Sequence, residues 1–307
     1  MQVTDPIFTD ADEARKFLEA ERWPDGPVCP HCGNAEQTAI CALQGKKHRP
    51  GLYQCNACRE QFTVTVGTVF ERSKIPLNKW LLASYLMTSS KKGISAHQLY
   101  RSLGFGSYRT AWFMAHRLRE AMRPNNPSPM GGDGATVEVD ETFIGRIKGV
   151  PKHAAGWAHK NVVLTLVERG GEARSFHVDS TSIADIVPIV KANVAKETAM
   201  MTDTASQFRN TGNFASHDKV AHSRDEYVRY EGERVISTNS VENYYSVFKR
   251  GMKGVYQHCG EQHLHRYLAE FDFRYSNRAG LDVDDATRTA KLVRNAEGKR
   301  LMYQRPA

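Results

Sequence analysis

The 307-residue sequence predicts a mixed α/β fold in which two small modules precede a larger domain built on a sheet. Two Cys-x-x-Cys pairs mark the first module, and helical spacing of apolar residues marks the second, between residues 76 and 124. Beyond a segment rich in Pro, Gly and Asn, the pattern changes to strand, hairpin, helix, strand and helix. That order is typical of a mixed sheet covered by helices.

Composition and charge narrow the class of protein. Hydrophobic residues make up 40% of the chain and charged residues 25%, as in globular proteins. No apolar run approaches the roughly 20 residues that span a bilayer, and "MQVTDPIFTDADEARKF" lacks the plan of a secretory signal. We therefore expect a cytoplasmic protein with no membrane partner, whose six cysteines form no disulfides.

The N-terminal part is expected to hold a helix and a zinc ribbon. "DADEARKFLEAERW" predicts a helix near residues 10 to 22, within a segment 1–25. In 26–70, "CPHC" and "YQCNAC" supply Cys29, Cys32, Cys55 and Cys58, and "QFTVTVGTVF" alternates like a strand. Four thiolates from two tight turns suit tetrahedral Zn²⁺ and leave no open position for chemistry. The zinc is therefore expected to be structural, since so small a module buries little apolar surface.

Residues 71–124 read as a helical, basic module. "SAHQLYRSLG" and "FGSYRTAWFMAHRLREAM" are two helices joined by a Gly-containing turn, the pattern of a helix-turn-helix. From Glu71 to Arg123 there are ten Lys or Arg against two Glu, which accounts for the whole net charge of +8 and indicates a nucleic-acid partner. A helical hairpin with a solvated surface is the alternative. The second helix carries four candidate DNA contacts: Arg109, His116, Arg117 and Arg119. Of these, we assign Arg109 and Arg117 as DNA-binding residues.

The sheet domain is assigned to residues 136–280, between a linker at 125–135 and a tail at 281–307. "TVEV" and "AMMT" read as two strands that end in Asp140 and Asp203. Carboxylates at the ends of neighbouring strands can share hard cations such as Mg²⁺. Glu242, on a following helix, would complete a site for two metal ions, the RNase H-like arrangement. Four other acids compete for these roles: Glu138, which shares a strand face with Asp140, Glu141, which points away, Asp179 and Asp185.

The stretch "NSVENYYSVFKRGMKG" leaves two readings of Glu242 open. Asn239 is a good helix N-cap, and Glu242 stands where a capping-box partner would. Lys249 and Lys253 share a stripe with Glu242, so this face of the helix suits a polyanion, and we assign DNA contacts to both lysines and to Arg250. The neighbouring stripe is expected to pack on a core: Val241, Tyr245, Phe248 and Met252.

These motifs, with "EVDETFIG", "MTD", "HS..EYVR" and the long segment from Asn239 to Arg278, resemble the bacterial insertion-sequence transposases of the ISXO type over roughly residues 10 to 300. The resemblance implies a zinc ribbon, a helix-turn-helix and a DDE catalytic domain with a retroviral-integrase-like fold. It implies that Asp140, Asp203 and Glu242 are the catalytic acids that bind two Mg²⁺ ions. Lys249 matches a basic residue that contacts DNA near the cleaved phosphate. Asn239 and Asn243 are rivals for the third metal position.

The function implied is metal-dependent cleavage of DNA at terminal inverted repeats, followed by transfer of the 3′ ends to target DNA. The expected partners are therefore transposon-end and target DNA, and the expected location is the cytoplasm, at the nucleoid. Because two ends must be cut and joined together, we expect a homodimer or higher oligomer on DNA. Two alternatives remain: a catalytically inactive DNA-binding regulator, and an RNase H-like nuclease without strand transfer.

Overall fold

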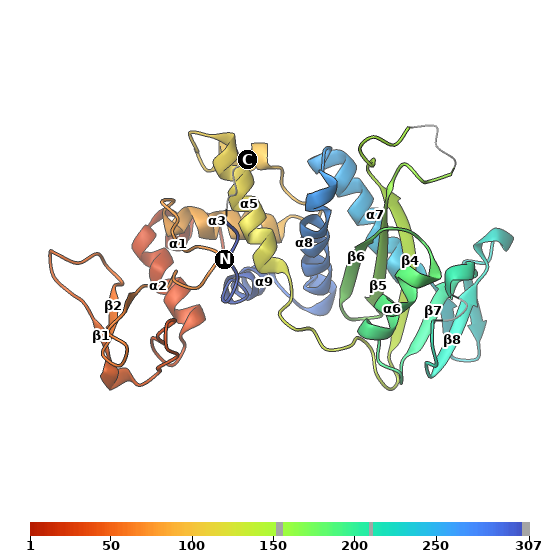
Figure 1. Cartoon of the computed structure of the whole chain (residues 1–307), viewed down its shortest axis with the longest axis horizontal. Helices are drawn as coiled ribbons and strands as arrows, with labels where there is room; N and C mark the ends of the chain where they lie inside the picture. Colours follow the sequence, from red (N-terminus) through yellow and green to blue (C-terminus); the bar gives the residue numbers. More distant parts are fainter. Residues whose placement is uncertain (152–155, 209–210, 303–307) are drawn as a thin grey trace. The chain divides into compact units, whose positions relative to one another are not determined.

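The computed structural model describes residues 1–151, 156–208 and 211–302, and divides the chain into two compact units. We call the first the ribbon unit: it comprises Met1–Ser90, Ile94–Pro124 and the chain from Val283 onward. The second, the sheet unit, comprises Lys91–Gly93 and Asn125–Asp282. Figure 1 shows the elements of both. No helix among the described residues is long and apolar enough to cross a membrane.

The predicted N-terminal helix is confirmed, and its start is set by Asp10, whose side chain accepts hydrogen bonds from the backbone N–H groups of Asp12 and Glu13. The end of this helix holds the ribbon through a cluster of three rings. Trp23 meets the edges of Tyr53 and Phe62 at 5.7 Å. The elements here are α1 (Pro6–Thr9), α2 (Ala11–Arg22), η1 (Gln37–Ala39), β1 (Ile40–Ala42), β2 (Tyr53–Cys55) and β3 (Gln61–Phe62), with the strands antiparallel in the order β1-β2-β3.

The long strand expected from "QFTVTVGTVF" is wrong, because only its first two residues form a strand, β3, and Thr68 makes an isolated bridge to Glu297. Turns follow, and Gly67 adopts φ +73°, a backbone conformation that side chains disfavour. Arg22 replaces the missing strand partner: its guanidinium donates to the carbonyl oxygens of Val64 at 2.6 Å and Val66 at 2.8 Å. Backbone polar groups that lack a ladder are thus satisfied by a side chain.

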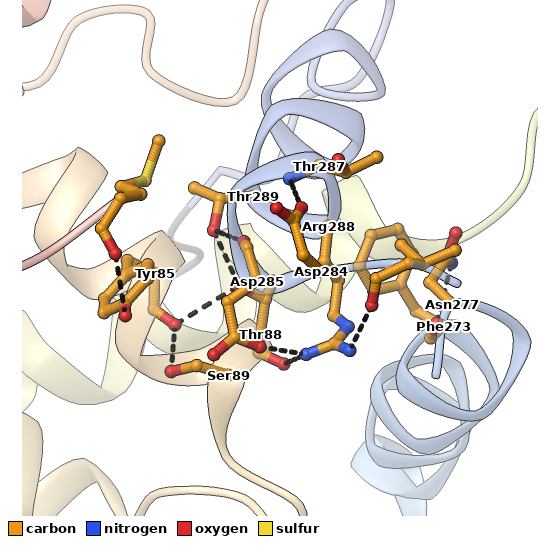
Figure 2. A network of polar contacts seen from close by, with 12 residues as sticks. Tyr85, Thr88, Ser89, Phe273, Asn277, Asp284, Asp285, Thr287, Arg288 and Thr289 are labelled. Carbon is orange, nitrogen blue, oxygen red and sulfur yellow. Dashed lines mark hydrogen bonds and ion pairs between the residues drawn. The ribbon is translucent and has the colours of Figure 1, made fainter. Parts of the chain in front are cut away.

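The segment 281–307, assigned to a tail, instead contains a helix that packs into the ribbon unit; residues 303–307 lie outside the described part. Thr289, Leu292 and Ala296 on this helix and just beyond it are fully buried. Arg288 donates to the carbonyl oxygen of Thr88 at 3.0 Å, and the hydroxyls of Thr88 and Thr289 lie 3.0 Å apart. These contacts belong to the network drawn in Figure 2. The helices are α3 (Leu77–Ser89), α4 (Ala96–Ser102), α5 (Tyr108–Met122) and α9 (Asp285–Arg294), and α9 contacts α2, α3 and α5.

The predicted mixed α/β sheet is confirmed in the sheet unit. Its five strands run in the order β6-β5-β4-β7-β8, antiparallel from β6 to β4 and parallel from β4 to β8. A separate hairpin, β9 with β10, follows the sheet. The strands are β4 (Thr136–Ile144), β5 (Asn161–Glu168), β6 (Ala173–Val178), β7 (Ala199–Asp203), β8 (Ser216–Val220), β9 (Val228–Glu231) and β10 (Arg234–Ser237).

Helices cover both faces of this sheet. β5 shows the division, because Val163 packs with the core on one face while Val162 and Leu164 pack with the core on the other. The predicted stripe of the helix that begins at Asn239 is confirmed as core, with all four of its residues buried. Those helices are α6 (Ile183–Asn193) on one face, and α7 (Asn239–Gly251), the π-helical turn η4 (Met252–Tyr256) and α8 (Leu264–Ser276) on the other; short 3₁₀ turns are η2 (Ser206–Phe208), η3 (His222–Arg224), η5 (Glu261–His263) and η6 (Ala279–Leu281).

Candidate functional site

The two Cys-x-x-Cys pairs converge in the ribbon unit. Their four sulfur atoms all lie within 4.8 Å of one another, and the Sγ atoms of Cys29 and Cys58, like those of Cys32 and Cys55, are 3.7 Å apart. A tetrahedron with Zn–S bonds of about 2.3 Å has edges of about 3.8 Å. The cluster fits a structural zinc.

Strand register places Asp140 and Asp203 at equivalent positions in the sheet unit. β4 and β7 are parallel neighbours, with Glu138 opposite Met201, and the same offset of 63 positions separates Asp140 from Asp203. By the two-residue period of a strand, both aspartates project from the face that α7 covers. The expectation that both strands end at an Asp is corrected for β4, which continues to Ile144 because β5 pairs with it along its whole length.

A buried ion pair fixes α7 against this face. Glu138 has no exposed surface: one of its oxygens accepts from Arg169 at 2.6 Å, and the other accepts from the backbone N–H groups of Ser240 and Val241 at 2.7 and 3.0 Å. The carboxylate therefore caps the N-terminus of α7 from a neighbouring strand. Arg169 also donates to the carbonyl oxygen of Ser237, at 2.9 Å, just before the helix.

The capping-box reading of Glu242 is wrong. The N-cap residue is Thr238 rather than Asn239, and the Thr238 side chain makes no capping hydrogen bond to the backbone of the helix. The Oε1 atom of Glu242 instead accepts from the Thr238 hydroxyl at 3.1 Å and lies 3.2 Å from Nε2 of His222. That ring nitrogen is also 3.0 Å from the Thr238 hydroxyl. The side chain of Glu242 is 43% exposed, so it remains available to a ligand.

Negative charge accumulates around Asp140. Burial raises its pKa to about 8, and the charges of Glu141, Asp203 and Glu242 add to the rise. Among the described residues, however, these acids do not form a group whose ligand oxygens all lie within 4.8 Å of one another. Asp140 accepts from the backbone of Glu141, and Asp203 accepts from the backbone of Ala205.

The unbalanced charge is what a divalent cation would neutralise. Glu141 has one oxygen 2.6 Å from the amide of Gln207 on the α6 side of the sheet, and its other oxygen is buried with no hydrogen-bond partner. Burial raises the pKa of Glu141, and the charge of Asp203 adds to the effect. Glu141 follows Asp140 directly in β4, so its side chain points to the other face of the sheet and does not join the two aspartates. On the α7 face, an aspartate whose pKa is strongly raised beside other carboxylates fits the donor set of a hard metal ion.

The remaining candidates for metal ligands either have other partners in the structure or lie exposed. Glu138 is occupied by Arg169 and the start of α7, as described above. Asp185 accepts from the hydroxyls of Ser180 and Ser182 and lies in the first turn of α6, where hydrogen bonds from those hydroxyls lower its pKa. Asp179 is exposed. Asn239 and Asn243, the rivals for the third metal position, are both exposed on α7.

The predicted cations of α7 differ in their surroundings. Lys249 is half-buried: burial lowers its pKa, the charge of Asp140 opposes that change, and the charges of Lys253 and Lys160 reinforce it. Lys249 is thus close enough to Asp140 to feel its charge. Lys253 is exposed in η4, one turn beyond α7. Arg250 is exposed but folds back on its own helix, where it donates to Ser246.

The predicted DNA contacts on α5 are corrected in part. Arg109 is exposed, whereas His116, Arg117 and Arg119 are buried. The guanidinium of Arg117 donates to the carbonyl oxygen of Glu71 at 2.7 Å and lies 5.3 Å from the centre of the Trp80 ring. Burial also lowers its pKa. A guanidinium enclosed by an aromatic ring and a backbone carbonyl stabilises the helix packing and is not presented to phosphate.

Sequence reasoning missed Arg169 and the setting of His222. Arg169 reads as part of the turn between two strands, and only the folded hairpin reveals that it reaches Glu138 and the chain before α7. His222 is one of twelve histidines in the chain, so residue type alone gave it no weight. Its place in "HS..EYVR" was the available signal, and the structure puts it beside Glu242.

The four-cysteine ribbon and the five-stranded mixed sheet with helices on both faces define a zinc-ribbon protein with a DDE-type domain. Residues 131–276 match the ISXO2-like transposase domain, and residues 9–61 match the transposase zinc-ribbon domain. The chain therefore contains an ISXO2-like transposase domain preceded by a transposase zinc-ribbon domain. It is 26% identical over 294 residues to an uncharacterized protein in transposable element ISH50 of Halobacterium salinarum, covering 88% of this chain and 92% of that protein.

Proposed function

We propose that this transposase cuts DNA at the terminal inverted repeats of an insertion sequence and joins the 3′ ends to target DNA by metal-dependent transesterification. The observation that supports the proposal is the strand register, which puts Asp140 and Asp203 at equivalent positions of parallel neighbours on the face that α7 covers. Burial raises the pKa of Asp140 to about 8, and the charges of Glu141, Asp203 and Glu242 add to the rise. Neither a ribbon nor a DNA-binding helix requires that arrangement.

The residues proposed to hold two Mg²⁺ ions are Asp140, Asp203 and Glu242. When bound there, the metal would activate the attacking oxygen and stabilise the leaving oxygen of an in-line phosphodiester displacement. Asp140 must give up its proton to act as a ligand, because its pKa of about 8 keeps it largely protonated at neutral pH. Thr238 and His222 hold Glu242 near the start of α7, and its charge already acts on Asp140.

The chain's cations would hold the DNA. Lys249 stands closest to the acids and would bind the phosphate beside the cut, with Lys253 and Arg250 further along. In the ribbon unit, we propose that α4 and α5 act as a helix-turn-helix and that Arg109 contacts DNA there. A homodimer or higher oligomer on DNA would bring two ends together, because strand transfer requires both.

The test is Mg²⁺-dependent cutting of end-labelled DNA that carries the flanking terminal repeats. Wild type should release a nicked product and then a joined product with unlabelled target, and Asp203→Asn should give neither. Asp185→Asn is the matched control, since it makes the same chemical change in the first turn of α6, on the other face of the sheet. Cutting by Asp203→Asn at the wild-type rate would refute the proposal. Cut products that never become joined would instead indicate a nuclease without strand transfer.

A further inference from the structure

A pocket of about 800 Å³ opens in the sheet unit next to the candidate acids. It is lined by the last residues of β4, the segment before β5, the end of α7 and η4, and the chain that leads into α8. Its volume lies within the range of pockets that hold small organic ligands. Lys249 belongs both to this lining and to the surroundings of Asp140. The pocket therefore borders the place where we propose phosphodiester chemistry.

The charge of the lining is almost entirely positive. Arg146, Lys160, Lys249 and Lys253 line the pocket, with Glu261 as the one carboxylate among its lining residues. Three of these cations are near enough to act on one another, because the charges of Lys160 and Lys253 both contribute to lowering the pKa of Lys249. Four cations against one carboxylate in the lining, with Asp140 as a further negative charge near Lys249, leave a net positive charge that favours an anion, and a phosphate would relieve the repulsion.

The pocket also presents an aromatic face. Trp157 is 55% exposed, which is unusual for so large an apolar side chain, and its ring stacks on Phe143 with 5.5 Å between centroids and 18° between planes. The ammonium of Lys160 lies 4.2 Å from the centre of the Trp157 ring. With Phe143 stacked on the same indole, the ammonium of Lys160 occupies the position over the ring that a stacked base would take, and rotation of the lysine side chain would carry it to the adjoining phosphate.

We propose that this pocket binds one unpaired nucleotide of the DNA end, with its base stacked on Trp157 and its phosphate among Lys160, Lys249 and Lys253. An unpaired nucleotide fits better than duplex, because bases within a duplex already stack on one another and offer only their edges. The inference rests on the proposed function, because it places that nucleotide beside the scissile phosphate. It adds that the terminal base pairs must open before or during cleavage.

Binding can be measured without chemistry, using the full-length zinc-loaded chain, no added Mg²⁺, and a single-stranded 12-mer that carries 2-aminopurine. Stacking on Trp157 should quench the 2-aminopurine fluorescence. Trp157→Ala should abolish the quenching and weaken binding about tenfold or more, the effect of losing one stacked base, whereas Trp157→Phe should retain most of the affinity. Lys160→Gln should reduce the slope of log affinity against log salt by about 0.7.

Tyr230→Ala is the matched control, because Tyr230 is a 73% exposed ring in the same unit and is not in the pocket lining. Equal affinity and equal quenching in wild type and Trp157→Ala would overturn the inference. Duplex cutting distinguishes this outcome from failure of the proposed function. If Asp203→Asn is inactive while Trp157→Ala cuts duplex ends with an unchanged KM, the nucleotide-site inference falls and the catalytic proposal stands. If no protein cuts but Trp157 still governs single-strand binding, the site stands and the catalytic proposal falls.

Discussion

Removing the carboxylate of Glu138 should release the N-terminus of α7 from the sheet. Glu138 is fully buried and accepts three hydrogen bonds, from Arg169, Ser240 and Val241. Losing one member of a buried ion pair costs about 3–5 kcal/mol, and losing a helix cap costs about 1 kcal/mol. Because the Arg169 side chain is 27% exposed and keeps its bond to Ser237, we expect about 3 kcal/mol for Glu138→Ala.

The assay should be local, since a chain with two units need not unfold in a single step. Amide hydrogen exchange of Ser240 and Val241 reports directly on the two backbone bonds to Glu138. A loss of about 3 kcal/mol corresponds to exchange about a hundredfold faster. Glu138→Gln keeps one carbonyl acceptor but loses the charge at the helix end, so it should cost less, about 1–2 kcal/mol.

Glu231→Ala serves as the control for Glu138→Ala. Glu231 also pairs with an arginine of the sheet unit, Arg229, but the Glu231 and Arg229 side chains are 48% and 36% exposed, and such pairs contribute at most about 1 kcal/mol. Exchange at the start of α7 should not change in this variant. If Glu138→Ala also left the exchange of Ser240 and Val241 unchanged, the carboxylate would not anchor the helix, and the account of how Glu242 is positioned would fail.

Three further predictions address the zinc, the metal ligands and the DNA contacts. Cys32→Ser should lose about one equivalent of zinc in a chromogenic chelator assay and expose residues 26–70 to protease, and retained zinc would contradict the assignment. Because its pKa is raised to about 8, Asp140 must lose a proton when Mg²⁺ binds near neutral pH. Calorimetry should therefore show the affinity for Mg²⁺ rising up to tenfold per pH unit from pH 6 to 8 and levelling above pH 8. An affinity that does not change with pH would argue against Asp140 as a ligand. Arg109→Ala should reduce the slope of log affinity against log salt concentration for duplex DNA by about 0.9 and leave the melting temperature of the protein unchanged. Arg117→Ala should chiefly lower the melting temperature, because Arg117 is buried. The reverse pattern would restore Arg117 as a DNA contact.

The spacing of apolar residues in the sequence predicted two elements of the sheet unit correctly. The apolar stripe of α7 and the run that ends in Asp203 follow from the helix and strand periods, and the structure has both. The helix α9 carried a comparable signal, with Asp284 as its N-cap and apolar residues at Leu292, Val293 and Ala296, yet assignment to a tail ignored it. The sequence therefore contains the signal for this helix.

Burial of charge could not be predicted in the same way. Arg109 and Arg117 lie on one helix and are the same residue type, and only the positions of Trp80 and the Glu71 carbonyl decide that Arg117 is enclosed. The acids present the same difficulty. Glu138 and Asp140 share a strand face, and nothing in "EVDET" says which of them has a partner. That depends on Arg169, which comes from a hairpin turn 31 positions away.

The contrast between these two acids explains why the candidate site lies where it does. The charge of Glu138 is matched by a guanidinium and by the positive end of α7, so it has no electrostatic reason to bind a further cation. The charge of Asp140 has no such match: burial and other carboxylates oppose its ionisation, and Lys249 compensates only in part. One strand therefore carries a neutralised carboxylate that anchors the helix and, two residues on, a carboxylate whose ionisation a cation would favour. A metal ion drawn to Asp140 would also draw in Asp203 and Glu242, because each raises the free energy of the others until positive charge arrives.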